Sequence, residues 1–305
     1  MISDTTAAPP RPPLTQAGFH ENVPYADYAR IGGIRWSTLK PYKRSALAGY
    51  FAETTPDEDT DALEFGTAFH TAVLEPEKFA ELYVTMPEFP GDYRSKEHKD
   101  AKKRWQDENV GKGHLKADRY QELLGMQASL RQHKTAGPLL YDTKGKNELT
   151  QVWRDSVSKQ LCQGRLDRFC RAPSVLLYPT VTDPKATQIV SIDLKTTAST
   201  FIEPRDFWRE YGKHGYFGQS AFYDDGLQTL RPEISVVHVC IAVEKKPPFD
   251  VVVHIVGDDT LAHGRNLYRR LLERRAAALE SNKFPGISSL PVTIQLPDWY
   301  SEGDL

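Results

Sequence analysis

The sequence contains little cysteine and no long apolar segment. Three of its 305 residues are cysteines, and Cys162, Cys170 and Cys240 are scattered along the chain. This odd, dispersed set excludes a disulfide framework and favours free thiols in a reducing cytoplasm. No apolar run approaches the roughly 20 residues that span a bilayer. Because the N-terminus also lacks the basic start and apolar stretch of a secretory signal, we expect a cytoplasmic protein without membrane contact.

The sequence also lacks an excess of positive charge. Lys and Arg number 39 against 41 Asp and Glu, which gives a formal net charge of −2. A whole-protein positive field that attracts nucleic acid is therefore absent, and any DNA contact must come from local basic patches. The 39% hydrophobic and 26% charged residues are ordinary for a globular protein and supply a core.

Proline content and apolar periodicity divide the chain into three parts. Residues 1–20 are rich in proline and predict a disordered tail. Residues 21–285 read as one domain, and residues 286–305 as a C-terminal extension. Helices are expected over 34–51 (with Ser37 as candidate cap), 62–74, 121–133, 203–224 and 258–283, and strands over 148–154, 160–169, 188–196, 234–243 and 250–256. This order predicts an α/β (α+β) fold, in which helices flank a central mixed sheet and the N-terminal part adds a helical elaboration.

An acid and a lysine share one face of the strand expected over 188–196. Side chains alternate along a strand, so Asp193 and Lys195 point one way while Ile192 and Leu194 point the other. A surface ion pair is the ordinary explanation of such a pattern. The preceding strand favours a functional site over a surface ion pair, because Asp167 supplies a second carboxylate. Two carboxylates beside a lysine suit Mg²⁺-dependent phosphodiester hydrolysis, although Asp167 could instead pair with Arg165 or Arg168.

These residues resemble a known nuclease signature. Asp167 followed by Asp193-Leu194-Lys195 is similar to the PD-(D/E)XK motif, with Leu166 where the proline often stands. Further segments resemble the RecB-like nucleases and their RecE-type (exodeoxyribonuclease VIII-like) phage subgroup, namely Gly66–His70, Glu75–Phe79, Gly215–Tyr223 and Leu296–Tyr300. Together they extend the resemblance from about Ile34 to the end of the chain, over a PD-(D/E)XK core.

The resemblance implies a role for each matching residue. Asp167, Asp193, the Leu194 carbonyl and His70 would hold Mg²⁺, for which Mn²⁺ could substitute. Lys195 would act on the attacking water or the developing phosphorane charge. Gln219 and Tyr223 share a helix face and would contact phosphate or metal-bound water, although plain helix packing remains the alternative. Glu148 begins a strand and could approach the metals, but most strand-end glutamates are solvated.

A charged stretch offers a candidate DNA contact. Residues 91–119 hold nine Lys or Arg against six Asp or Glu. The basic residues proposed to track a DNA backbone are Arg94, Lys96, Lys99, Lys102, Lys103 and Arg104. The interleaved acids favour the alternative of a solvated helix face. Arg269, Arg270, Arg274 and Arg275 are expected to form a solvated or subunit-facing stripe.

The resemblance implies a Mg²⁺-dependent exonuclease that acts on double-stranded DNA ends from 5′ to 3′. It would be phage-encoded or prophage-derived, and would work with a RecT-like single-strand annealing protein as a ring-shaped homo-oligomer. The alternatives are an endonuclease or Cas4-like enzyme of the same fold, or a catalytically inactive DNA-binding or assembly subunit. Intact Asp167, Asp193 and Lys195 disfavour the inactive subunit. Three cysteines cannot supply the four thiolates of an iron–sulfur cluster, so none is expected.

Overall fold

The computed structural model describes residues 16–55, 60–197 and 204–295. Most of the expected tail, as well as the Leu296–Tyr300 motif, lies outside these residues. The tail prediction is wrong at its C-terminal end, because Gly18–His20 forms the first strand, β1, and pairs with Thr150–Val152 of β4. The pairing supplies hydrogen-bond partners that the local sequence does not reveal.

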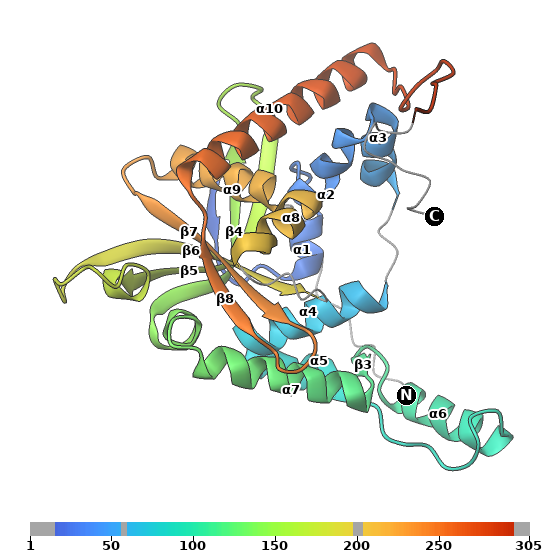
Figure 1. Ribbon diagram of the computed structural model, residues 1–305. Helices are drawn as coiled ribbons and strands as arrows, with labels where there is room; N and C mark the ends of the chain where they lie inside the picture. Colours follow the sequence, from blue (N-terminus) through green and yellow to red (C-terminus); the bar gives the residue numbers. More distant parts are fainter. Residues whose placement is uncertain (1–15, 56–59, 198–203, 296–305) are drawn as a thin grey trace, which may run out of the picture.

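A six-stranded sheet forms the centre of the fold (Figure 1). Its strands, in spatial order, are β1, β4 (Lys144–Arg154), β5 (Leu161–Pro173), β6 (Thr187–Thr197), β7 (Val236–Glu244) and β8 (Val251–Ile255). Neighbouring strands are antiparallel except for β6 and β7, which are parallel. The predicted mixed sheet is therefore confirmed. Strands β4, β5 and β6 are longer than the sequence indicated, whereas β7 and β8 are shorter.

Helices surround this sheet, and a small parallel pair of strands lies apart from it. The helices are α1 (Tyr25–Ala29), α2 (Trp36–Leu39), α3 (Ala46–Thr54), α4 (Asp61–Leu74), α5 (Pro76–Leu82), α6 (Lys96–Glu108), α7 (Ala117–Gln132), α8 (Pro204–His214), α9 (Tyr216–Leu230) and α10 (Asp258–Ser281). Short helical turns occupy Lys40–Lys43, Pro138–Asp142 and Ser174–Leu176, and the small pair consists of β2 (Tyr83–Thr85) and β3 (Gly113–Leu115). None of the helices in the described ranges is long and apolar enough to cross a membrane.

The two faces of the sheet are buried by different helices. On one face, Ile192 and Ile241 pack with Phe69 of α4 and Leu123 of α7. On the other face, α8, α9 and α10 cover the strands, and Cys240 packs with residues of α8. The alternation of side chains along a strand produces this division. It turns Asp193 and Lys195, the polar residues of β6, toward the side of α8 and α9.

Two predicted helices are broken where the sequence carries specific signals. The helix expected over 34–51 is wrong as one element, because a short turn containing Pro41 separates α2 from α3. Ser37 does not cap it; Ser45 instead accepts a hydrogen bond from Ala48 N at 3.0 Å and begins α3. The helix expected over 203–224 divides at Gly215, whose φ of 71° lies in the left-handed region that glycine adopts without strain.

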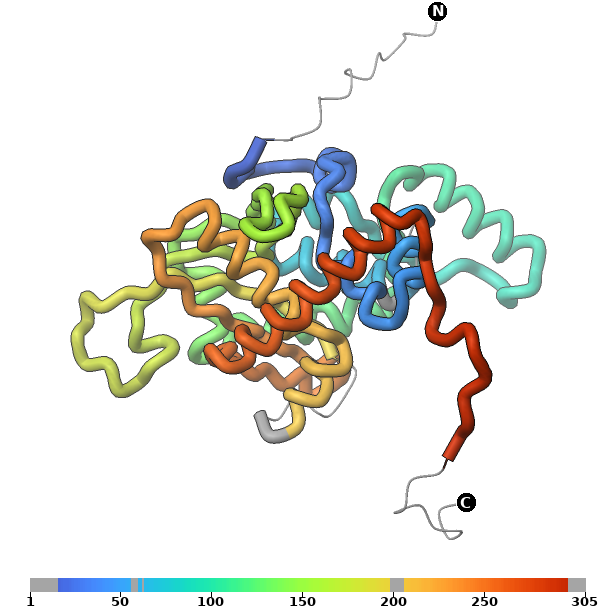
Figure 2. Tube along the Cα trace, turned by 90° about the horizontal axis from the view of Figure 1, so that it is seen from above, coloured from blue at the N-terminus to red at the C-terminus, as the bar shows by residue number. Residues whose placement is uncertain are grey.

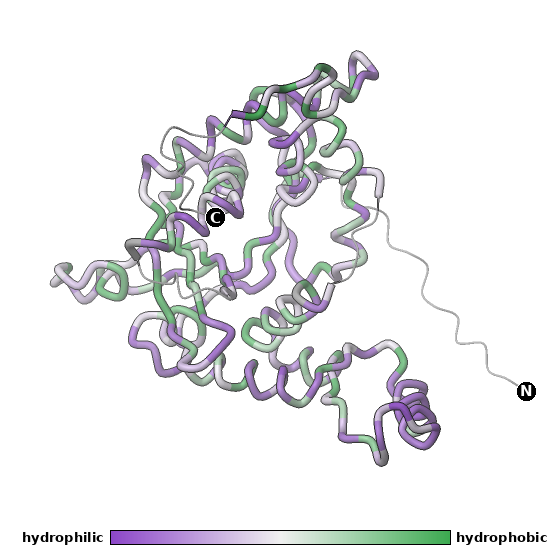
Figure 3. Tube along the Cα trace, turned by 45° about the vertical axis from the view of Figure 1, so that its right-hand side comes forward, coloured by the Kyte–Doolittle hydropathy of each residue, from purple (hydrophilic) through white to green (hydrophobic). Residues whose placement is uncertain are grey.

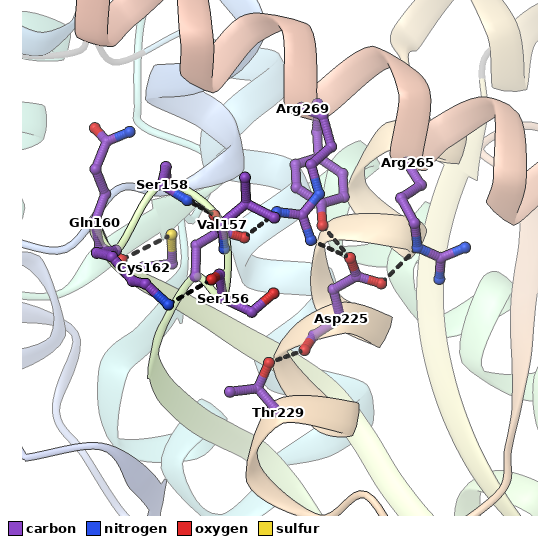
Figure 4. Close-up of polar contacts among 12 residues, drawn as sticks. Ser156, Val157, Ser158, Gln160, Cys162, Asp225, Thr229, Arg265 and Arg269 are labelled. Carbon is purple, nitrogen blue, oxygen red and sulfur yellow. Dashed lines mark hydrogen bonds and ion pairs between the residues drawn. The ribbon is translucent and has the colours of Figure 1, made fainter.

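The arginines of α10 bind within the chain, contrary to the expected free stripe. Arg269 bridges Asp155 of the β4–β5 turn and Asp225 of α9, at 2.6 and 2.9 Å (Figure 4). Arg274 donates to the carbonyl oxygen of Tyr42 at 2.6 Å, and Arg275 pairs with Glu53. These contacts fix α10 across the fold. Arg270 differs from the other three, because it bonds only within its own helix.

Candidate active site

Strands β5 and β6 separate at the predicted catalytic residues. Their antiparallel pairing runs from Pro173 and Thr187 to Arg168 and Ile192, and stops before Asp167 and Asp193. Beyond that point Asp167 Oδ2 accepts a hydrogen bond from the backbone N–H of Leu194 at 2.7 Å. The N–H and C=O of a strand residue point to the same side. The Leu194 carbonyl therefore also faces the gap between the strands, as its expected role requires.

Glu148 joins this site through an unusual backbone conformation. It lies on β4 between two regular pairs, Asn147 with Arg168 and Leu149 with Leu166, which places it opposite Asp167. Its φ of 50° is in the left-handed region, which non-glycine residues seldom adopt. Strained backbone of this kind is concentrated at functional sites. The feature brings Glu148 beside Asp167, where sequence reasoning left it open.

Three side chains from three elements form a group suited to a metal ion. His70 of α4, Glu148 and Asp167 each offer a ligand atom, and these atoms lie within 4.8 Å of one another. His70 Nδ1 is 3.6 Å from Asp167 Oδ2. Carboxylate oxygens with one imidazole suit hard or borderline divalent cations. The structure therefore brings together two of the predicted metal ligands, His70 and Asp167, and adds Glu148.

Asp193 lies beside this group and is held by its own partners. Its Oδ1 accepts hydrogen bonds from Lys195 Nζ at 2.6 Å and from Gln219 Nε2 at 3.3 Å. Its Oδ2 is buried and, within the described part of the chain, has no hydrogen-bond partner. A buried carboxylate oxygen without a partner is costly. A bound cation would relieve that cost, which makes Asp193 a fitting further ligand.

Burial and mutual repulsion dominate the electrostatics of the site. Burial, reinforced by the nearby charge of Asp167, raises the pKa of Glu148 to about 8, and Arg165 at 3.7 Å only partly opposes this. Burial acts to lower the pKa of Lys195, but Asp193 and Asp167 outweigh it and raise that pKa. Lys195 is therefore protonated at neutral pH.

Helix α9 contributes side chains to the same site. A small cavity between β5, β6 and α9 is lined by Asp167, Asp193, Gln219 and Tyr223 among others. Burial raises the pKa of Tyr223, so its hydroxyl stays protonated. Tyr216, for which sequence reasoning favoured packing, places its ring 4.8 Å from Lys195 Nζ in a cation–π contact.

The structure adds one basic residue that sequence reasoning did not select. Lys40 extends its side chain past the junction of α8 and α9, where a Cβ built on Gly215 would lie 3.5 Å from its Cδ. Burial, with the like charge of Lys195, lowers the pKa of Lys40. No local motif marks this position, because the proximity of Lys40 to Lys195 arises from tertiary packing. The predicted DNA-binding residues, in contrast, lie on and just before α6, away from the sheet (Figure 1).

Comparison with known proteins agrees with this geometry. The model of a family described as a PDDEXK-like domain of unknown function (DUF3799) matches residues 36–290. No curated protein sequence matches. Among solved structures, a candidate exonuclease from Eubacterium rectale is similar in fold, with a TM-score of 0.51 and 13% identity over 92% of this chain and 95% of that one. Since the family model spans most of the sequence, the chain belongs to the PDDEXK-like DUF3799 family.

Proposed function

We propose that this protein is a metal-dependent deoxyribonuclease that digests duplex DNA from its ends. The observation that carries the proposal is the meeting of His70, Glu148 and Asp167 with the Asp193–Lys195 pair where β5 and β6 separate. A purely structural ion pair would need only Asp193 and Lys195. The additional carboxylates repel one another unless a cation joins them.

The residues present fit a divalent metal ion. Asp167, Glu148, His70 and the unpartnered oxygen of Asp193 would hold it, with the Leu194 carbonyl facing the same gap. When bound, Mg²⁺ or Mn²⁺ polarises a phosphate oxygen and lowers the pKa of coordinated water. Cys162 and Cys170 lie on β5 and Cys240 lies on β7, and all three are buried. None of them belongs to the group of His70, Glu148 and Asp167, which supports a metal bound by oxygen and nitrogen ligands.

The lysine acts as a cation. In the metal-free protein Asp193 and Asp167 raise the pKa of Lys195, which favours the role of a cation over that of a proton acceptor. Its ammonium instead donates to a phosphate oxygen or orients the water, and it stabilises negative charge that develops in the transition state. Gln219, bonded to Asp193, keeps that carboxylate in position, and the protonated Tyr223 is available as a hydrogen-bond donor.

The finer features of the proposal rest on the resemblance to RecE-type exonucleases. These are digestion from 5′ to 3′, production of single strands for recombination, a RecT-like annealing partner, and a cytoplasmic phage or prophage setting. A ring-shaped homo-oligomer belongs to the same proposal, although Arg269 and Arg275 of α10, which a subunit contact could have used, bind within the chain. Light scattering at assay concentration tests the ring, which a monomeric mass with full processive activity contradicts.

One assay tests the central proposal and its closest alternative. Linear and covalently closed duplex, each end-labelled where an end exists, are incubated with Mg²⁺, Mn²⁺ or EDTA. We expect loss of the linear duplex alone, with label released first from 5′ ends, and no reaction in EDTA. Cleavage of the closed circle identifies an endonuclease instead. Failure of the Lys195→Ala variant to cleave either substrate excludes a contaminating nuclease.

A further inference from the structure

Helix α6 carries its charges in separate stripes. An α-helix turns through 3.6 residues, so residues three, four and seven apart share a face. Lys96, Lys99 and Lys103 follow this spacing, and Lys102 lies beside them. A second stripe holds the acidic residues with Arg104 among them, namely Glu97, Asp100, Asp107 and Glu108. The mixture of signs in the sequence is thus sorted by the helix into a basic face and an acidic face.

The third face of α6 fixes the direction of the other two. His98, Ala101 and Trp105 are half-buried. The Trp105 ring lies 4.7 Å from that of His114, which is on β3, and 6.1 Å from that of Phe89, while His98 lies 5.5 Å from Phe89. Because these rings hold the helix from both flanking segments, α6 cannot turn about its axis. Its basic face therefore has one fixed orientation.

The basic face is free to bind an external anion. Within the described residues no carboxylate pairs with Lys96, Lys99, Lys102 or Lys103, and Lys96, Lys99 and Lys103 are exposed. Helix α6 extends from the rest of the fold in both Figure 1 and Figure 2, and Figure 3 shows it among the most hydrophilic parts of the trace. Opposite charges stand three and four residues apart where the two faces meet, as Asp100 does from Lys96 and Lys103. Among the described residues none of these pairs is formed, so the lysines keep no carboxylate partner.

We infer that the lysine face of α6 binds the phosphate backbone of the duplex, and that the acidic face, with Arg104, does not contact it. This inference rests on the proposed nuclease function and names the surface that holds the substrate. A row of ammonium groups one helical turn apart suits a polyanion of regular charge spacing and needs no base contact. The inference also narrows the predicted DNA-binding set from six basic residues to the four lysines of α6. Arg94 instead stacks on Tyr93, with 4.9 Å from Cζ to the ring centroid.

Two charge-neutralising triple variants with opposite faces test the inference. The first is Lys96→Gln/Lys99→Gln/Lys103→Gln, and the matched control is Glu97→Gln/Asp100→Asn/Asp107→Asn. Binding of a long blunt duplex is measured by fluorescence anisotropy in EDTA, in which we expect no cleavage, over a series of salt concentrations. Circular dichroism confirms that each variant is folded.

We expect the lysine variant to bind on the order of tenfold more weakly, with the slope of log affinity against log salt reduced by about 3. The acidic-face control keeps wild-type affinity or exceeds it. Unchanged affinity and slope in the lysine variant overturn the inference, as does equal weakening in both variants. The Lys195→Ala variant separates the two proposals: it should lose cleavage while it keeps the larger part of the salt dependence, because it retains the α6 lysines. Cleavage by Lys195→Ala refutes the active-site assignment while leaving the binding result for α6 intact.

Discussion

Glu148, at a φ of 50°, and Asp167 lie opposite each other on paired strands, and each places a ligand atom within 4.8 Å of one on His70. Two carboxylates in one buried site repel each other in the absence of a cation. The protein therefore accepts both an uncommon backbone conformation and a repulsive pair at the same position. Such a combination favours a binding role, because a structural role would be served better by a neutral pair.

Replacement of Glu148 should raise stability in the absence of metal. The unfolded chain ionises Glu148 near its ordinary pKa of 4.5, whereas the folded chain does so at about 8. Wild-type stability therefore falls as the pH rises between these values, and the loss is complete above about 8. In EDTA, Glu148→Gln should melt at a higher temperature than wild type, by a margin that grows from pH 5 and levels off above pH 8. With Mn²⁺ present, wild type should gain more stability than the variant. A pH-independent difference contradicts the raised pKa.

Removal of the central catalytic groups should abolish cleavage without unfolding the protein. Asp167→Ala and Asp193→Ala each remove a metal ligand together with like-charge repulsion, and both variants should stay folded. Asp193→Ala also leaves the ammonium of Lys195 without its counter-charge and should melt at a lower temperature than wild type in EDTA. Lys195→Ala should reduce turnover by about 10²–10³-fold, the usual effect of losing one group that stabilises the transition state. Lys195→Arg should also fail, because a planar guanidinium replaces a compact ammonium poorly. Single-turnover cleavage with saturating Mg²⁺ measures these effects. A near-wild-type rate in any of these variants would contradict the catalytic role proposed for that residue.

Lys40 should assist substrate binding near Lys195, the proposed catalytic lysine. Among the described residues it has no carboxylate partner, and it shares its surroundings with Lys195. Two neighbouring cations favour a phosphate between or beside them. Lys40→Ala should therefore raise KM by about tenfold, with a smaller change in kcat. Lys43→Ala, in the same short helical turn, is the control and should match wild type. Equal behaviour of the two variants would exclude Lys40 from the site.

The contact of α10 with the β4–β5 turn should contribute measurably to stability. Arg269 donates to Asp155, which is 3% exposed, and to Asp225. Arg269→Ala leaves Asp155 without its counter-charge and should cost about 1–3 kcal/mol. Asp155 retains its bonds from the backbone N–H groups of Val157 and Ser158, which limits the loss. Arg270→Ala, one residue further, should stay within about 0.5 kcal/mol of wild type. Urea unfolding compares the two, and equal midpoints would show that Arg269 is solvated in solution.

Local patterns predicted the strands better than the connections between helices. Alternation along β6 placed Asp193 and Lys195 on one face, and the structure confirms it. The break at Gly215 had a visible signal, since Gly212, Gly215 and Gly218 already weakened the expected helix. The position of Glu148 on a strand suggested an approach to the metal site but could not decide it, because the register that sets it opposite Asp167 cannot be obtained from local sequence. The proximity of Lys40 to Lys195 arises from packing between distant segments. The stripes of α6 follow from helical spacing alone, because the same spacing that predicts a solvated helix face also separates the lysines from the acidic residues.

The hydrogen bond from the Leu194 amide to Asp167 has a spectroscopic consequence. It replaces a strand-to-strand bond at the point where β5 leaves β6, so one carboxylate both closes the gap and faces the cation position. A cation that draws electron density from Asp167 weakens this bond. The ¹H–¹⁵N resonance of Leu194 should therefore shift upfield in the proton dimension during titration with a diamagnetic divalent ion. That single amide would report occupancy of the site without any DNA present.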